Sequence, residues 1–442
     1  MKINLPETGQ ERIVIVGGGF AGLTLARKLA KSQYQVVLID KNNYHQFQPL
    51  FYQVAMAGLE PSSIIFPYRK LFQHHKNVFI RMTEVNAVDL KKKQLQTPYG
   101  IVNYDHLILS MGVDTNFFGN QKIAELAMPL KDVSEALLLR NKILEDYEKA
   151  LVITDFEERQ RYIDIVIVGG GPTGVEVAGA LAEMKQFILP KDYPEMDISE
   201  IDIYLIQSGP RLLKGMSEEA ADKALKFLTQ LGVKVQLNTR VKDFDGKYAY
   251  MNDGTKICTS KVIWAAGIKG NTIDGLPADA ICRGNRLLVD ELHQVKGMEN
   301  VYAIGDLAQM ESEEYPHGHP QVAQVAIQQA KNLAANFKRK AKNKEVRAFS
   351  YKNRGSMATV GRHRAVVDLP KFRFQGTFAW LVWMVVHLFA ILGVKNKLFV
   401  FINWVWNYLT YDQSLRLILR AKTPHQLDNR TEDTSTSIPA KD

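Results

Sequence analysis

The stretch Arg12–Gly22 reads RIVIVGGGFAG, and its order of residue types decides the fold of the first part of the chain. The β-branched run Ile13–Val16 predicts a strand buried on both faces of a parallel sheet. Gly17, Gly19 and Gly22 then form a G-x-G-x-x-G pattern. The first glycine permits a tight turn, the second lets the backbone approach a pyrophosphate, and the third lets the next helix pack close to the strand.

The residues after this stretch complete a dinucleotide-binding unit. Leu23–Lys31 is expected to be helical, and the free N–H groups at the start of that helix suit phosphates. A second predicted strand, Val36–Ile39, ends in Asp40. An acid at this place can hydrogen-bond an adenosine ribose.

The chain repeats the pattern once. Ile163–Gly174 reads IDIVIVGGGPTG, again with glycines at the three positions Gly169, Gly171 and Gly174. Two such motifs predict two dinucleotides, a permanently held flavin and a nicotinamide that binds and leaves. Because the first motif uses the first strand of the chain, we expect the FAD site there. The second unit's strand Ile201–Ile206 is followed by Gln207 instead of an acid.

The composition predicts a chain of two or three domains with an affinity for acidic surfaces. It has 442 residues, 46% of them hydrophobic, and a net charge of +9. Residues 331–373 hold 13 Lys and Arg but only two acids, which favours a membrane surface because apolar sequence follows directly. Cys258 and Cys282 form no short-spaced pair, so neither a disulfide framework nor a metal site is expected. No nucleic-acid partner is expected.

The predicted fold class is α/β, with two Rossmann-like dinucleotide-binding domains and a C-terminal amphipathic-helical membrane-anchoring domain. The expected boundaries are 1–120 with 280–345 for a discontinuous FAD-binding domain and 121–279 for the NAD(P)H-binding domain. Residues 346–421 are expected to bind a membrane, and 422–442 to be a disordered tail.

The C-terminal segment predicts two amphipathic helices that lie in a membrane surface. Phe378–Val394 is apolar but short for a span, which needs about 20 residues. Several Trp and Tyr side chains suit the membrane interface, and Lys395 and Lys397 interrupt the apolar run. A buried hydrophobic subdomain, a dimer face and a single transmembrane helix are the alternatives.

The motifs GGGFAG, YHQFQPLFYQVA, GGGPTGVEVAG, WAAGIKGN, YAIGD, AQVAIQ and NKLFVFINWVWNY occur in this order along nearly the whole chain. Together they resemble type II NADH:quinone oxidoreductases, the non-pumping alternative NADH dehydrogenases. GGGPTG is shared by many flavin disulfide reductases, whereas AQVAIQ with the aromatic C-terminus is much more specific.

The resemblance implies an enzyme that transfers hydride from NADH to FAD and two electrons to a membrane quinone, without pumping protons. It also implies a homodimer, peripheral on the cytoplasmic face of the cell inner membrane. Two alternatives stay open. A sulfide:quinone oxidoreductase would need redox cysteines beside the flavin, and a non-catalytic NAD(P)H-sensing flavoprotein would reoxidise slowly with quinone.

The candidate site residues follow from the two motifs and from the resemblance. Cofactor binding is expected at Gly17, Gly19, Phe20, Ala21, Gly22, Asp40, Gln48, Gly112, Gly305, Asp306, Gly169, Gly171, Gly174, Gln207 and Gly267. The resemblance gives catalytic roles to Glu176, Gln324, Gln328 and Lys397, and quinone binding to Gln324, Gln328, Lys397 and Val400.

For three of these residues the sequence also allows a role outside catalysis and cofactor binding. Glu176 also completes a possible capping box with Thr173. Asp306, expected at the ribityl chain, could instead be the N-cap of the next helix. Lys397, expected to favour a developing quinone oxyanion, could contact a lipid headgroup.

Gln207 predicts that NADPH is possible as a donor beside NADH, because a neutral amide does not repel a 2′-phosphate. The family more often has Glu there, and Arg211 could pair with the phosphate. Gln207→Glu should raise the preference for NADH over NADPH by about tenfold or more, the size expected for about 1.4 kcal/mol of added repulsion. The measurement is kcat/KM for both donors; an unchanged ratio would show that Gln207 does not face the ribose.

Overall fold

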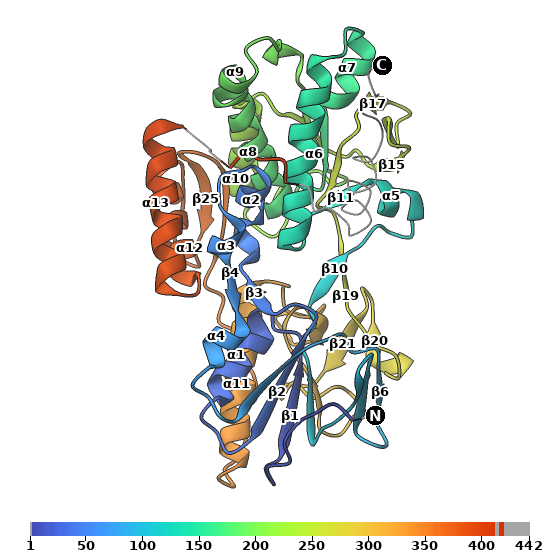
Figure 1. Cartoon of the computed structure of the whole chain (residues 1–442), viewed down its shortest axis with the longest axis vertical. Coiled ribbons are helices and arrows are strands. Elements are labelled where there is room, and N and C mark those ends of the chain that lie inside the picture. Colours follow the sequence, from blue (N-terminus) through green and yellow to red (C-terminus); the bar gives the residue numbers. More distant parts are fainter. Residues whose placement is uncertain (1, 412–414, 420–442) are drawn as a thin grey trace, which may run out of the picture.

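The computed structural model describes residues 2–411 and 415–419. The described chain forms two α/β units, one above the other in Figure 1, with a C-terminal unit along one side. The α/β prediction with two dinucleotide-binding units is therefore confirmed. The predicted tail, 422–442, lies outside the described residues.

The first unit is built on a five-stranded parallel sheet of order β22-β9-β1-β2-β5. Its strands are β1 (Arg12–Val16), β2 (Gln35–Asp40), β5 (Val78–Met82), β9 (His106–Leu109) and β22 (Val301–Ala303). The central strand is buried along its whole length, as the β-branched run predicts.

Alternate side chains of β1 build different cores on the two faces of this sheet. Ile13 and Ile15 pack with helices α1 (Phe20–Leu29) and α11 (Ala323–Lys340). Val14 and Val16 face the other side, where a small antiparallel sheet covers them. That sheet consists of β6 (Ala87–Asp89), β7 (Gln94–Thr97) and β8 (Gly100–Asn103).

The second unit repeats this plan with the sheet order β11-β18-β12-β13-β14. The strands are β11 (Met128–Pro129), β12 (Ile165–Val168), β13 (Ile203–Ile206), β14 (Lys234–Gln236) and β18 (Val262–Trp264), and all pair in parallel. Helices α6 (Val133–Leu151), α8 (Pro172–Phe187) and α10 (Glu218–Gln230) belong to this unit, as does the antiparallel sheet β15 (Val241–Phe244), β16 (Tyr248–Met251) and β17 (Lys256–Cys258).

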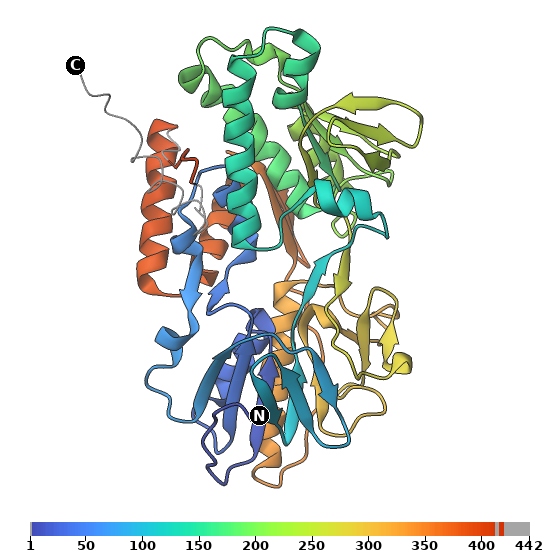
Figure 2. The same ribbon diagram turned by 45° about the vertical axis from the view of Figure 1, so that its right-hand side comes forward.

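A two-stranded ribbon joins the units. β10 (Val113–Thr115) leaves the first unit and β19 (Ile268–Gly270) returns to it, and the two strands pair antiparallel. Figures 1 and 2 show this ribbon between the two sheets.

The C-terminal unit consists of a three-stranded antiparallel sheet and two helices. The elements are β24 (Ser356–Gly361), β25 (Arg364–Asp368), β26 (Arg373–Gln375), α12 (Thr377–Ala390) and α13 (Val394–Thr410). β24 crosses α8 so closely that a Cβ at Gly179 would overlap the backbone of Val360. Within the described ranges, no helix is long and apolar enough to cross a membrane.

The remaining elements are short, and β20, β21 and β23 among them form a further three-stranded sheet. They are β3 (Tyr44–Gln46), η1 (Gln48–Leu50), α2 (Phe51–Ala55), α3 (Pro61–Ile64), β4 (Ile65–Pro67), α4 (Tyr68–Phe72), α5 (Gln121–Leu126), α7 (Phe156–Ile163), α9 (Leu189–Asp192), η2 (Ile198–Glu200), η3 (Ala278–Ala280), β20 (Ile281–Cys282), β21 (Arg286–Val289), η4 (Gly305–Leu307) and β23 (Ala308–Met310).

The third glycine of each motif packs where a side chain has no room. A Cβ at Gly22 would overlap the carbonyl oxygen of Gly17, and a Cβ at Gly174 would overlap that of Gly169. By contrast, a Cβ at Gly19 would meet no atom within 4 Å. The glycines of one motif therefore serve two different purposes.

Gly22→Ala should lower the thermal unfolding midpoint by roughly 5 °C, because overpacking costs about 1–3 kcal/mol. Gly19→Ala should leave the midpoint of the flavin-free protein unchanged. Instead, it should weaken FAD binding at least tenfold, by obstructing the approach of the pyrophosphate. Calorimetry and flavin titration measure the two effects, and equal behaviour of both variants would contradict this division of roles.

Candidate functional site

The first glycine loop forms a donor-rich turn at the carboxyl end of β1. Gly17 has a φ of +95°, which favours glycine, and the backbone N of Gly18 donates to Asp40 Oδ2 at 2.5 Å. Helix α1 has Gly19 as its N-cap, without a side-chain cap. Its first N–H groups are therefore available to a pyrophosphate, and the open space above Gly19 fits one.

Tyr68 supports this loop and was not predicted as a site residue. Its hydroxyl donates to Gly18 O at 2.9 Å and lies 3.3 Å from Asp40 Oδ2. Burial raises the pKa of Asp40, and the Gly18 and Asn42 N–H groups oppose that rise. Only the fold brings Tyr68 here, since it lies 28 residues beyond Asp40.

The second glycine loop reproduces the first with an amide in place of the acid. Gln207 Oε1 accepts from the backbone N of Gly170 at 2.9 Å, as Asp40 does from Gly18. Arg211 is held nearby, with Nη1 3.8 Å from Glu218 Oε1 and Nη2 donating to Lys214 O.

The start of helix α8 does not have the capping box that the sequence allowed. Its N-cap is Gly171, with no side-chain cap, and Pro172 occupies the first turn. The capping-box alternative for Thr173 and Glu176 is therefore wrong, because both residues lie inside the helix, as its second and fifth residues. The first N–H groups of α8 are free for phosphates, as in α1.

A cleft with a volume of about 680 Å³ extends from the first glycine loop to the first turns of α8, which follow the second glycine loop. One end is formed by the first glycine loop, and the other by Pro172, Thr173 and Glu176 of α8. The predicted residues that line it are Gly17, Gly19, Phe20, Ala21, Asp40, Gln48, Gly112, Gly305, Asp306 and Glu176. The structure thus brings together residues that are far apart in sequence.

Other predicted residues lie outside the lining of this cleft. Gly22 and Gly174 pack helix against strand, and Gly169, Gly171 and Gln207 form the second loop. Gly267 has a φ of +74° and lies against the ring of Phe118 next to the ribbon strand β19. Whether these residues bind cofactors stays a prediction.

Lys131 is a charged residue of the cleft that the sequence analysis missed. Burial lowers its pKa, while Asp306, Asp114 and Glu135 oppose that change. The signal was its place two residues after strand β11, because ligands of parallel sheets bind at the carboxyl ends of strands. Asp306 lies in η4, whereas the N-cap of α11 is Val322, so its alternative as cap of that helix is wrong.

The amides of Gln324 and Gln328 bind backbone. Gln324 donates to Gly355 O at 2.9 Å and accepts from Arg354 N at 3.0 Å. Gln328 bonds both the N and the O of Lys352. The two side chains share one face of α11, as predicted, and hold the segment that leads into β24.

Lys397 and Val400 lie in the N-terminal half of α13. Lys397 Nζ donates to Phe389 O at 2.9 Å, at the C-terminal end of α12, and Val400 is fully buried. His387 of α12 reaches the cleft itself and stacks on Trp383 with ring centroids 4.1 Å apart. The predicted quinone roles of Lys397 and Val400 remain untested.

Glu176 faces the cleft from α8 beside Tyr52. Burial raises its pKa to about 8, and a hydrogen bond from the backbone N of Thr359 opposes this only in part. The carboxyl group therefore carries its proton at neutral pH. It can donate a hydrogen bond toward a ligand oxygen.

Two family models match the chain. The pyridine nucleotide-disulphide oxidoreductase family covers residues 11–330, and the NDH2 C-terminal domain covers residues 353–411. Both matches agree with the two α/β units and the separate C-terminal unit of the structure.

Characterised relatives resemble nearly the whole chain. The type II NADH:quinone oxidoreductase NdhA of Mycobacterium tuberculosis is 37% identical over 90% of this chain and 87% of its own length. The type II NADH:quinone oxidoreductase of Haemophilus influenzae is 28% identical, over 90% and 98% of the two chains. The structure of NDH2 from Plasmodium falciparum in complex with NADH has a TM-score of 0.85 at 24% identity, covering 93% of this chain and all of that chain.

The raised pKa of Glu176 gives a pH-dependent stability. In the unfolded chain this carboxyl ionises near its ordinary pKa of 4.5, but in the folded protein only near 8. Its contribution is therefore fully present below about pH 4.5 and is lost as the pH rises toward 8. Glu176→Gln should remove this loss, so that the variant becomes more stable relative to wild type between pH 5 and 8. Urea unfolding at both pH values measures the difference, and a constant difference would contradict the assignment.

Proposed function

Since the chain belongs to the type II NADH:quinone oxidoreductases, we propose that its long cleft is the place where NADH and FAD meet. The chain is an NADH-oxidising flavoenzyme with quinone as acceptor. When bound, FAD would supply the redox chemistry, namely acceptance of hydride from NADH and transfer of two electrons to quinone. The chain's own residues bind and orient the reactants.

The observation that carries this assignment is the continuity of the cleft. It runs from the first glycine loop to the N-terminal turn of α8, which follows the second glycine loop. FAD in the first unit and a nicotinamide held by the second unit would therefore meet in one space. Gly17 and Gly19 would receive the pyrophosphate, Asp40 the ribose, and Asp306 the ribityl chain.

Three residues would orient the reacting end of the cleft. Glu176 would lie beside the nicotinamide and donate a hydrogen bond from its protonated carboxyl group. Gln324 and Gln328 would act on the quinone side by holding the segment that leads to Met357, which lines the cleft. Cys258 and Cys282 lie in β17 and β20, outside the lining of the cleft, which does not favour a sulfide:quinone oxidoreductase.

The outer face of α12 and α13 would bind the membrane that holds the quinone. Its exposed apolar side chains include Phe378, Leu381, Val385, Val386, Phe389, Val394, Leu398, Phe399, Phe401, Ile402, Val405, Trp406 and Leu409. Exposed apolar area of this extent marks an interaction surface. Attachment to the cytoplasmic face of the inner membrane and a homodimer complete the proposal.

One experiment tests the enzyme and its membrane face together. The double variant Leu398→Asp, Phe401→Asp removes two side chains that are 55% and 49% exposed on α13. It should oxidise NADH with a water-soluble quinone as wild type does. With a long-chain quinone embedded in vesicles it should lose at least ten-fold in rate and no longer co-sediment, because burying a charge in the apolar layer is unfavourable.

Leu138→Asp is the matched control, since Leu138 is 63% exposed on α6 in the other unit. It should leave both rates and vesicle binding unchanged. A wild type without quinone-dependent NADH oxidation would refute the function, whereas full vesicle activity of the double variant would refute only the membrane face.

A further inference from the structure

The charges that line the cleft do not balance those of its proposed ligand, because FAD carries a pyrophosphate with a permanent negative charge on each phosphate. Among the described residues, the lining has seven carboxyl groups, no arginine and two lysines, Lys41 and Lys131. Its histidine, His387, stays neutral because burial lowers its pKa to about 4. A pyrophosphate binds in such a space only where a cation is within reach.

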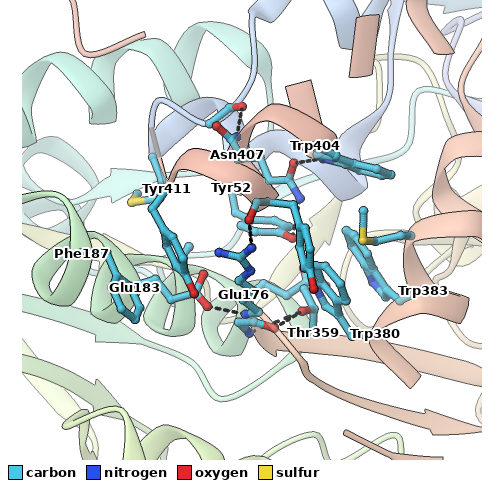
Figure 3. A pocket seen from close by; sticks show the side chains of 18 of the residues that line it. Tyr52, Glu176, Glu183, Phe187, Thr359, Trp380, Trp383, Trp404, Asn407 and Tyr411 are labelled. Atoms are coloured by element: carbon cyan, nitrogen blue, oxygen red, sulfur yellow. Dashed lines mark hydrogen bonds between the residues drawn. The ribbon is translucent and has the colours of Figure 1, made fainter. Parts of the chain in front are cut away.

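Several of the carboxyl groups already have partners. Asp40 Oδ2 accepts from the backbone N of Gly18, and Asp114 Oδ1 accepts from the backbone N of Thr115 at 2.7 Å. Glu176 is protonated at neutral pH and also borders a second cavity, which lies between α8 and the C-terminal helices. Figure 3 shows its side chain among those that converge on that cavity. These carboxyl groups therefore have partners other than a lysine of the cleft.

Lys131 enters the cleft from the second unit, between β11 and α6. The start of α6 is fixed by a capping box, in which Asp132 is the N-cap and Glu135 bonds back to it. The backbone N of Val133 also donates to Gln46 Oε1 of β3 at 3.1 Å. The Lys131 side chain therefore projects into the cleft from a backbone that is held on both sides.

The ammonium group of Lys131 makes no ion pair and no hydrogen bond with any described residue. The carboxyl groups of the adjacent Asp132 and Glu135 accept from backbone N–H groups of the capping box instead. Burial lowers the pKa of Lys131, so its charge is poorly solvated. A poorly solvated cation without a bonded partner favours an anionic ligand in the same space.

Asp306 of the first unit faces Lys131. Burial raises the pKa of Asp306, and Lys131 opposes that rise more than Arg286 does. Burial lowers the pKa of Lys131, and Asp306 is the acid that opposes this fall most. Each residue is therefore the main counter-charge of the other, although they form no direct ion pair. Because Asp306 is the proposed contact of the ribityl chain, which joins the pyrophosphate in FAD, the lysine lies on the side of the cleft that the phosphates approach.

We propose that Lys131 binds the pyrophosphate of FAD from the second unit, while the first glycine loop binds it from the first. This inference rests on the proposed function, because it takes FAD as the ligand of the cleft. The free N–H groups at the start of α1 and the ammonium group of Lys131 would share the phosphate oxygens. FAD would then contact both α/β units and hold them together across the cleft.

Lys131→Met tests this contact by removing the charge while keeping an unbranched side chain. After dilution of the holoenzyme, FAD should leave the variant at least about tenfold faster than wild type, because a charge-assisted hydrogen bond is lost. The rise in free-flavin fluorescence measures this rate. High salt should accelerate FAD release from wild type more than from the variant, since salt screens the attraction between lysine and phosphate. Lys131→Arg keeps a phosphate-binding charge and should release FAD more slowly than Lys131→Met.

Lys226→Met is the matched control, since Lys226 is exposed on α10 and lies outside the lining of the cleft. It should release FAD as wild type does. Thermal unfolding separates a role in binding from a role in folding. Added FAD should raise the unfolding midpoint of wild type more than that of Lys131→Met, whereas the two flavin-free proteins should unfold at the same temperature.

The reduction potential of the bound flavin identifies the group that Lys131 contacts. The pyrophosphate keeps its charge when the flavin is reduced, so Lys131→Met should have the potential of wild type. A lower potential with an unchanged rate of FAD release would place the charge at the flavin ring and overturn the proposal. An equal loss of the unfolding midpoint with and without FAD would also overturn it, because Lys131 would then serve only as a structural partner of Asp306. A wild type that holds no FAD would instead refute the proposed function.

Discussion

The arrangement of this molecule depends on a contact without side chains, the crossing of β24 over α8 at Gly179. A Cβ at that position would overlap the backbone of Val360, so the strand can lie on the helix only because the residue is glycine. This approach fixes the C-terminal sheet, and through it α12 and α13, against the second unit. As a result, one face of α8 contributes to both cavities while its N-terminus faces the cleft.

Much of the fold follows from local sequence. A β-branched run before each glycine motif predicts a buried parallel strand, and β1 and β12 are these strands. The spacing of the motif also predicts the strand–helix approach at Gly22 and Gly174. These features depend on residues within about ten positions of each other in the chain, so a local sequence pattern can encode them.

Among the functional residues, only those beside a glycine motif have a place that the local sequence predicts. Asp40 and Gln207 could be identified because each ends a strand beside a glycine motif. The amides of Gln324 and Gln328 were assigned to a quinone, but the structure has them on backbone groups 24 to 31 residues away. The proximity of Tyr52 to Glu176, and that of Trp383 to α8, depends on how three units pack. No spacing in the sequence encodes such contacts.

The ribbon of β10 and β19 limits how the two dinucleotide units can move relative to each other. A single linker could twist and bend in any direction, but here two antiparallel strands hydrogen-bond side by side. Twisting the units about the ribbon would shear those hydrogen bonds, whereas flexing the ribbon out of its plane leaves them intact. The two units are therefore expected to move by hinge bending about the ribbon, and this motion opens and closes the cleft along its length. Exchange of a nicotinamide would then need no change in the alignment of the two glycine loops.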